Sequence, residues 1–512
     1  MSQPQAIDPN TVKNRGLITA AIMLGTIMQV LDTTIANVAL PSMSGDLGAS
    51  QDTITWVLTS YIVAAAIMTP MTGWLSDRFG RRELFLVSVA GFTVTSMLCG
   101  LAWNIESIVA FRLMQGLFGA AIVPLAQTFL LDINPRERHG QAMAIYGAGI
   151  MIGPIIGPTL GGYLTDAFNW RWVFFINLPL GILTLIGSAA YLPKIGTRLR
   201  SFDFFGFAML SLGVGALQLM LDRGAEVDWF NSPEIWIETG LSLIGFWVFI
   251  VHLLTNKNTF IDPAIFKDRN FSTGLLFIFI VGVMLFSSMA LLPPMLSSLF
   301  NHTTTLTGLV MAPRGVGTMI SMLLVGQLVR RFDPRILVVA GLGLTAWSLH
   351  MMTNFTPQMD DHLIIWSGVV QGLGLGLVFV PLTSLAFATL PPQFRTDGTA
   401  LFSLVRNMGS SIGISIVTVF LTRMTQINHA ELSAGLTPYN PNLSAALPGA
   451  LTGDVTSLTQ LDQLVTQQAA MISYVADFKL MMLVTLAAIP LALLLRKPGA
   501  AAAGGAPAVH MD

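Results

Sequence analysis

The sequence predicts an all-α integral membrane protein with fourteen transmembrane helices and both termini in the cytoplasm. Of its 512 residues, 53% are hydrophobic and only 10% are charged, whereas soluble domains usually carry about 25% charged residues. Long apolar runs, each able to cross a hydrocarbon core about 30 Å thick, alternate with short polar connectors. Lys and Arg are concentrated in every second connector, which is typical of cytoplasmic loops.

The apolar runs define the expected helices in chain order. Six spans come first, at residues 16–40, 54–75, 84–103, 107–131, 141–164 and 172–192. Eight more follow, at residues 204–222, 235–255, 272–294, 306–329, 336–354, 363–388, 399–422 and 477–495. The first run is too long for the core of a signal peptide, so we expect it to remain as a helix.

Basic residues give the orientation of these spans. With the N-terminus inside, the even-numbered connectors and the termini hold most of the 26 Lys and Arg residues. The odd-numbered connectors and their borders hold four, at Arg171, Arg223, Arg423 and Lys479. Three more arginines, Arg112, Arg314 and Arg406, fall within spans. An even number of helices fits this distribution.

Charge and cysteine usage exclude several classes of protein. The net charge of -1 leaves no basic patch for nucleic acid. The only cysteine, Cys99, excludes a disulfide framework, and seven scattered histidines give no metal-ligand spacing. We find no phosphate-cradling loop and no nucleophile motif, so we expect neither an enzyme nor an ATP-driven pump, and neither a metal nor a cofactor.

Two short stretches recur along the chain, which indicates an internal duplication. "GWLSDRFGRR" (73–82) and "GQLVRRFDPR" (326–335) align at an offset of 253, and "QGLFG" at 115 aligns with "QGLGL" at 371 at an offset of 256. Transporters are often built from such repeats. The expected organisation is a cytoplasmic segment (1–15), a six-helix bundle (16–195), two linker helices (196–270), a second six-helix bundle (271–497) that includes the external loop 423–476, and a disordered tail (498–512).

Charges inside spans are the strongest functional candidates. An ionisable group near the bilayer centre costs about 2.5–3.5 kcal/mol, so such groups tend to mark ion or substrate paths. Asp32 lies in the outer half of the first span, and we expect it to couple protons and to face the substrate cavity. The alternative is a structural carboxylate bound to Thr33, Asn37 or a neighbouring Arg. Asp222 and Glu238 lie near outer helix ends, where we expect wetted side chains.

Other polar residues within spans are candidates for the substrate cavity. They are Gln29, Asn37, Tyr61, Gln115, Gln371, Arg314 and Arg406. Met and Phe, with 27 and 31 copies, suit promiscuous binding of hydrophobic ligands, although most must face lipid or core.

Four motifs carry a family resemblance. The loop after the second span holds Gly73, Asp77, Arg78, Gly80, Arg81 and Arg82, and "RLMQGLFGA" holds Arg112, Gln115 and Gly116. "GPIIGPTLGG" holds Gly153, Gly157, Pro158, Gly161 and Gly162. The fourth motif is "LDTTIANVALP" in the first span, in which Ala36 stands where Val is common. With these motifs the chain resembles the major facilitator superfamily, and more narrowly its fourteen-helix drug/proton antiporters of the EmrB/QacA type.

The resemblance implies a secondary active transporter of the bacterial inner membrane. It would export hydrophobic or amphipathic drugs by alternating access, driven by a proton gradient, and so contribute to antibiotic resistance. Arg112 would tune the proton affinity of a partner carboxylate; the alternative is an interfacial anchor. The alternative function is the dedicated export of one endogenous metabolite or siderophore.

Three segments have expected roles in gating, packing and assembly. In the loop 73–82, Asp77 is expected to latch one state by binding a helix N-terminus or an Arg, unless the loop is merely a positive-inside loop. The glycines of 153–162 are expected to shape and seal the interface between the halves. Residues 457–475 are expected to form an amphipathic helix that docks a periplasmic adaptor leading to an outer-membrane channel, or else a lid or a tolerated insertion.

Overall fold

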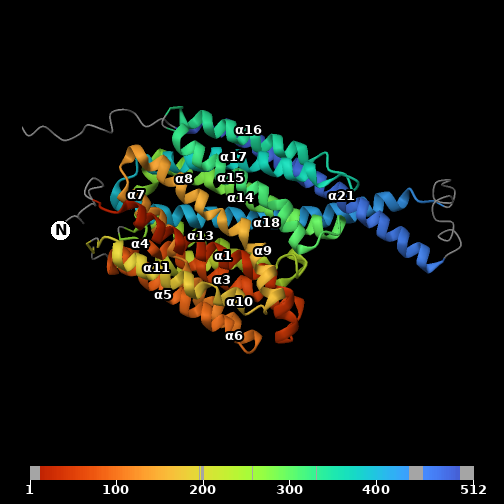
Figure 1. Ribbon diagram of the computed structural model, residues 1–512, viewed down its shortest axis with the longest axis horizontal. Coiled ribbons are helices and arrows are strands. Elements are labelled where there is room, and N and C mark those ends of the chain that lie inside the picture. The colour runs from red at the N-terminus through yellow and green to blue at the C-terminus, as the bar shows by residue number, and fades with distance from the viewer. Residues whose placement is uncertain are drawn as a thin grey trace, which may run out of the picture.

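The computed structural model describes residues 12–194, 196–197, 201–256, 258–329, 331–437 and 454–495, and the regular elements within these ranges are helices. Fourteen helices are long and apolar enough to cross a membrane, which confirms the predicted fold class. Figure 1 shows them as a bundle of roughly parallel rods. The predicted disordered tail 498–512 lies outside the described residues.

The first six spans are built from several helical pieces. These are α1 (Arg15–Leu47), α2 (Gln51–Ile54), α3 (Trp56–Met68), η2 (Thr69–Met71), α4 (Thr72–Phe79), α5 (Arg81–Gly100), α6 (Ile105–Gly119), α7 (Ile122–Ile133), η3 (Arg136–Arg138), α8 (His139–Ile150), α9 (Ile152–Ala167), α10 (Trp172–Phe175) and α11 (Asn177–Tyr191). The second span breaks at η2, where Pro70 supplies no backbone N–H. Gly80, with φ of 93°, makes the tight turn between α4 and α5.

The remaining eight spans follow in the same order as predicted. They and their connectors are α12 (Phe204–Arg223), η4 (Trp229–Asn231), α13 (Pro233–Thr255), η5 (Pro263–Lys267), α14 (Arg269–Leu299), α15 (Thr304–Leu328), α16 (Pro334–Met352), α17 (Asp361–Ala388), η6 (Pro392–Phe394), α18 (Arg395–Ala434), α21 (Val455–Ala488) and η7 (Pro490–Leu494).

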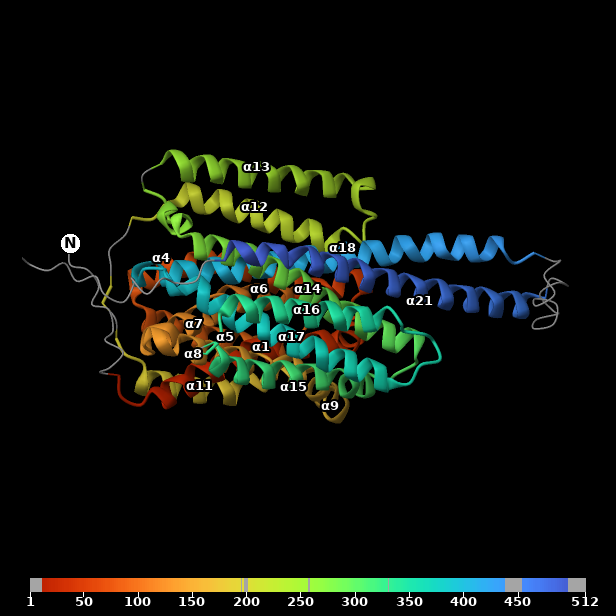
Figure 2. The ribbon, with the colours of Figure 1, turned by 90° about the horizontal axis from the view of Figure 1, so that it is seen from above.

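The helices from the two ends of the chain pack as two groups that meet along a shared interface. At this interface α8 and α9 pack against α15, while α4 and α7 pack against α18. Figure 2 shows α12 and α13 side by side at one edge, where α12 contacts α3 and α18. We call the end of the bundle that holds Arg78, Arg136 and Arg395 the basic end, and the other end the opposite end.

The long loop before the last span is more regular than the sequence indicates. α18 continues to Ala434, and α21 begins at Val455, so the amphipathic helix expected at 457–475 is continuous with the last span. The two helices form a hairpin that projects beyond the other helices at the opposite end (Figures 1 and 2). Asn428 donates a hydrogen bond to Ser473 at 2.9 Å, and His429 contacts Asp462, so polar contacts hold the hairpin together. Residues 438–453 lie outside the described residues.

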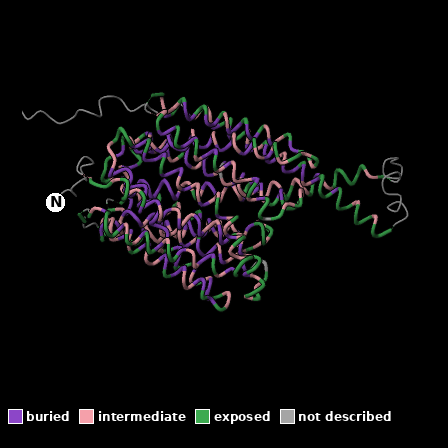
Figure 3. The backbone as a smooth tube through the Cα atoms, viewed as in Figure 1, coloured by how far each residue is buried: buried purple, intermediate pink, exposed green. Residues whose placement is uncertain are grey.

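Burial follows the pattern of a protein surrounded by lipid. Buried residues line the interior of the bundle, and exposed residues lie on its outer faces (Figure 3). Many of the exposed side chains are large and apolar, such as Trp236, Ile237 and Trp247 of α13. In water this face would favour aggregation, but it suits a hydrocarbon environment.

Candidate functional site

Asp32 and Arg112 form a buried ion pair. Arg112 of α6 donates through Nη1 to Asp32 Oδ2 of α1 at 2.7 Å, and each residue is 1% exposed. Arg112 Nε also donates to the backbone oxygen of Val57 at 3.0 Å. Arg112 therefore points into the protein rather than to the interface, which excludes its expected alternative as an interfacial anchor in this conformation.

Two neutral side chains complete the shell around Asp32, and a third supports one of them. Gln115 Nε2 and Asn177 Nδ2 donate to Asp32 Oδ1 at 3.0 and 2.7 Å. Gln115 Oε1 accepts from Arg112 at 2.8 Å, and Asn177 also donates to Ser96 at 2.9 Å. Both carboxylate oxygens of Asp32 therefore accept hydrogen bonds, as buried polar groups generally do.

Aromatic side chains cover the guanidinium of Arg112. The ring of Tyr61 lies 4.3 Å from its central carbon, and the ring of Phe174 lies 5.7 Å away. Both are within reach of a cation–π interaction. The Tyr61 hydroxyl in turn accepts from Gln29 at 3.3 Å, so this residue joins the cluster through Tyr61.

The residues expected to line a substrate cavity are mostly enclosed in this conformation. Tyr61, Gln115 and Gln371 are 3%, 0% and 1% exposed, and they face packed protein. Asn37 is exposed and lies five residues beyond Asp32 on α1, outside the shell around that carboxylate. Hydrogen bonds enclose Gln115 and Tyr61 within the cluster around Asp32, and Gln371 bonds Ser288 instead.

The glycines of α9 pack against α1 around Asp32. A Cβ added at Gly153 would meet Val30, one at Gly157 would meet Thr34, and one at Gly161 would meet Ile35. We expected these glycines to seal the interface between the halves, whereas they contact a helix of their own half. The spacing of the glycines in the sequence predicts a smooth helix face but does not identify the helix that packs on it. The contact of α9 with α15 involves Pro158 and Thr159, which lie near Gly308, and an added Cβ at Gly162 would meet nothing.

A second polar cluster repeats the first in the C-terminal half. Ser288 and Gln371 lie 256 residues after Asp32 and Gln115, and Gln371 donates to Ser288 at 3.3 Å. Arg314 of α15 also donates to Ser288, at 2.9 Å. Gly368 lies 256 residues after Arg112, and an added Cβ there would meet Arg314. The duplicated unit thus carries its cation on a different helix and a serine in place of the carboxylate.

The third arginine within a span lies at the interface between the halves. Arg406 of α18 is half-buried and lies near the buried Tyr146 of α8. It is outside both polar clusters, so the structure does not bring it together with Asp32.

An ion-pair cluster centred on Asp132 joins the two halves at the basic end. Asp132 of α7 accepts from Arg81 of α5 and from Arg395 of α18, the latter at 2.8 Å. Nearby, Thr128 and Thr399 share a hydrogen bond of 2.8 Å. α4, which carries Asp77 and the exposed Arg78, packs against the start of α18. Gly73 has no room for a Cβ because the side chain of Asp397 fills that space.

Several residues of these clusters were not singled out from the sequence. Asn177 is a polar residue in an otherwise apolar span, which is a signal that could have found it. Asp132 ends a span, and Arg395 counted only as a basic loop residue. Within the parts of the chain that the structure describes, no three His, Cys, Asp or Glu side chains gather as metal ligands would.

Comparison with known proteins agrees with this architecture. The sequence profile of the Major Facilitator Superfamily matches residues 22–414. The chain belongs to the major facilitator superfamily. As a member of this superfamily it is a multi-pass membrane transporter rather than an enzyme.

Two relatives and one solved structure are similar to the chain over most of its length. It is 38% identical to the multidrug export protein EmrB of Escherichia coli K12, over 84% of each chain. It is 33% identical to the fatty acid resistance protein FarB of Neisseria gonorrhoeae, over 95% of this chain and 97% of that one. The crystal structure of the human organic anion transporter MFSD10 (TETRAN) aligns with a TM-score of 0.58 and 14% identity, covering 92% of this chain and 100% of that one. That likeness shows the fold alone.

Proposed function

We propose that this protein is a proton-driven antiporter that exports hydrophobic or amphipathic drugs from a bacterial cell by alternating access. The observation that carries the proposal is the buried pair of Asp32 and Arg112 inside a membrane-spanning bundle. The names of the relatives supply the substrate class, since EmrB is a multidrug export protein.

The pair offers a simple way to couple a proton to a change of conformation. While Asp32 is ionised, its attraction to Arg112 holds α1 against α6. A proton on Asp32 removes that attraction and leaves Arg112 without a counter-charge, which favours a rearrangement of the helices. Release of the proton on the other side of the membrane restores the pair. The proton gradient then supplies the energy, and the transporter needs no cofactor.

The basic end supports alternating access. The ion pair of Arg395 with Asp132 and the close contact of Gly73 with Asp397 hold the two halves together on that side. Opening towards the basic end requires these contacts to break, while the Asp32 cluster lies between the two ends. A rocking motion of one half against the other meets both requirements.

Transport of ethidium by purified protein in liposomes tests the function. A pH gradient imposed across the liposome should drive ethidium accumulation, and nigericin, which dissipates the gradient, should stop it. Other hydrophobic drugs should compete. Ethidium transport that requires ATP and ignores the pH gradient would overturn the proposal. Transport of one endogenous metabolite only, with no movement of drugs, would favour the dedicated exporter instead.

The projecting hairpin of α18 and α21 supports docking of a periplasmic adaptor, which would connect the transporter to an outer-membrane channel. Leu432, Leu436, Leu461, Leu464 and Val465 surround an apolar cavity of about 220 Å³ on the hairpin. Leu464 is 53% exposed, and the hairpin that carries it extends beyond the other helices. An exposed apolar patch of this kind is typical of a protein interface.

Replacing Leu464 with Asp should separate transport by the protein itself from export by the whole assembly. We expect drug resistance of cells to fall to the level of cells without the transporter, because a charge would not pack in an apolar interface. Ethidium transport in liposomes should stay within about twofold of wild type, since surface changes rarely disturb a fold. Thr466→Asp, on another face of α21, is the control. Unchanged resistance in the Leu464 variant would favour a lid or a tolerated insertion.

A further inference from the structure

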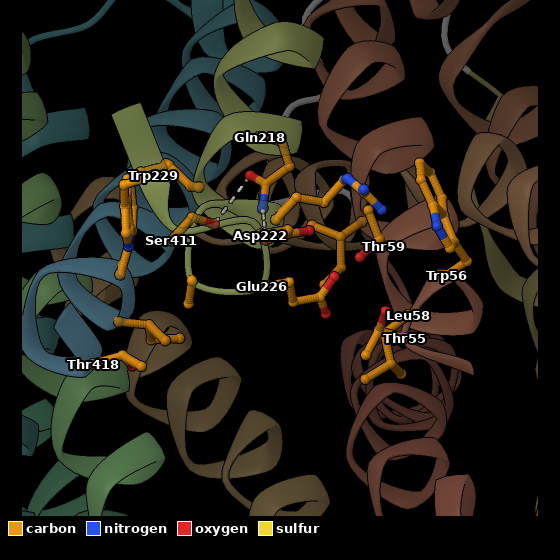
Figure 4. A pocket seen from close by; sticks show the side chains of 16 residues that line it. Thr55, Trp56, Leu58, Thr59, Gln218, Asp222, Glu226, Trp229, Ser411 and Thr418 are labelled. Atoms are coloured by element: carbon orange, nitrogen blue, oxygen red, sulfur yellow. Dashed lines mark hydrogen bonds between the residues drawn. The ribbon is translucent and has the colours of Figure 1, made fainter. Parts of the chain in front are cut away.

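A second cavity lies at the opposite end, between α3, α12 and α18. It has a volume of about 280 Å³ and is lined by residues of all three helices and of the segment that follows α12. We call it the linker cavity, after the linker helix α12, and Figure 4 shows its principal side chains, from Trp56 and Thr59 to Asp222, Trp229 and Ser411. It is thus bordered by helices from the N-terminal and C-terminal groups as well as by the linker pair.

The linker cavity is separate from the Asp32 cluster. α3 lies between them, because Val57 and Tyr61 contact Arg112 whereas Trp56, Thr59 and Ile62 line the cavity. The two sites therefore use different faces of the same helix.

Asp222 gives the cavity a carboxylate whose hydrogen-bonding capacity is only partly used. One carboxylate oxygen accepts from Gln218 at 2.9 Å, and Gln218 accepts from Ser411 of α18 at 3.0 Å. The Thr59 side chain also interacts with this carboxylate, and the other oxygen, Oδ2, is shielded from solvent and makes no hydrogen bond of good geometry to the described residues. Figure 4 shows Asp222 at the centre of the cavity. A carboxylate oxygen left in this way is costly unless a ligand or water binds it.

The other charges do not neutralise Asp222. Arg223 is engaged by Glu234, to which it donates at 2.5 and 3.2 Å, and its guanidinium lies 5.3 Å from the ring of Trp56. Glu226 adds a second carboxylate to the lining. The excess charge of the linker cavity is therefore negative, and Asp222 lies near the end of α12, where its side chain is half-buried.

The walls are apolar and aromatic. Leu58, Ile62, Leu221 and Ile414 line the cavity beside Trp56 and Trp229. Trp229 is held there by a strained backbone, because Asp228 and Trp229 have φ of 57° and 51°, in the left-handed region. Two consecutive residues in this region cost about 1–3 kcal/mol each, and such strain is concentrated at functional sites.

We propose that the linker cavity binds a small organic ammonium ion with an aromatic or aliphatic body. Asp222 provides the counter-charge, and the tryptophans contact the body and the cationic head, as cation-binding aromatic sites do. The volume limits the ligand to a small amine, since pockets for drug-sized ligands are about 300–1,000 Å³. This site goes beyond the proton-driven function, and either proposal can fail alone.

Binding of benzyltrimethylammonium to the purified full-length protein in nanodiscs tests this site. Calorimetric titration should give saturable binding to wild type, and Asp222→Asn should raise Kd by about tenfold or more, which corresponds to the loss of about 1.4 kcal/mol. Asp166→Asn is the matched control, because this exposed carboxylate near the end of α9 is not in the lining and takes no part in holding Trp229. Its Kd should stay within about twofold of wild type.

A variant that fills the linker cavity provides an independent check. Ile414→Trp leaves Asp222 in place and should abolish binding of the probe, even if Asp222→Asn fails to fold. Nanodiscs with and without phosphatidylethanolamine identify the source of the ammonium group: competition by this lipid assigns the site to its headgroup, and no competition assigns it to a soluble amine. Absence of saturable binding to wild type, or wild-type affinity in both variants, would overturn the proposal.

Discussion

Replacing Asp32 with Asn is expected to abolish ethidium transport driven by a pH gradient, down to the level of liposomes without protein. Asn has the shape of Asp but cannot carry a proton between the two sides of the membrane. Exchange of labelled for unlabelled ethidium, which needs no net proton movement, should persist. Both rates are measured in the same preparation, so a variant that retains exchange and loses driven transport has lost coupling alone.

The same substitution should also lower stability, and this effect must be separated from coupling. Removing one partner of a buried ion pair costs about 3–5 kcal/mol, because the remaining charge stays buried. In the double variant Asp32→Asn with Arg112→Gln, neither charge remains, so we expect its thermal unfolding temperature to recover towards wild type. Driven transport should stay absent in the double variant. Recovery of transport with stability would instead show that Asp32 is a structural carboxylate.

A matched control guards against a general effect of lost negative charge. Asp166 lies on the exposed end of α9 in the same half of the protein. Asp166→Asn should transport at wild-type rate, with an unfolding temperature close to that of wild type. An equal loss of transport in this control would remove the reason to assign coupling to Asp32.

The fold follows from the sequence because the lipid leaves few choices. Backbone groups in hydrocarbon must be satisfied within each segment, so every long apolar run becomes a helix. Outside the hydrocarbon this constraint is absent, so the sequence predicts less well how far each helix extends beyond its apolar run. α18 and α21 extend as helices beyond the apolar runs at 399–422 and 477–495, since helical hydrogen bonds do not require apolar side chains.

Partnerships within the site depend on packing that no local pattern encodes. Asp32 and Arg112 are each recognisable as charges within spans, but they are 80 residues apart in sequence. Asn177 is 145 residues from Asp32 and reaches it because α11 packs beside α1. The glycine pattern of α9 likewise predicts a smooth face but not that α1 would occupy it.

Replacing Asp132 with Asn is expected to open the basic end. The Asp132 side chain is 7% exposed and is the common acceptor for Arg81 and Arg395, so the variant leaves two enclosed cations without their counter-charge. Separation of the halves would admit water to both arginines. A change of about 3 kcal/mol would shift the ratio of open to closed molecules by about 100-fold. Transport should slow, because return to the closed state is disfavoured.

Distances between spin labels can measure this opening directly. Labels at Glu137→Cys and Gln393→Cys would lie on exposed residues of the two halves at the basic end. The native Cys99 is 0% exposed, so it should not react with the label. In Asp132→Asn the distance distribution should move to longer values. Glu83→Gln is the control, because this carboxylate is 43% exposed and contacts Arg82 of its own helix.

The two arginines should differ in effect, because only one of them crosses between the halves. Arg395→Gln removes the link from α18 to Asp132 and should lengthen the distance nearly as much as Asp132→Asn does. Arg81→Gln removes a contact within the N-terminal half and keeps the link to Arg395, so its shift should be smaller. Equal shifts in the two arginine variants, or an unchanged distance in a folded Asp132→Asn, would show that this ion pair does not hold the basic end closed.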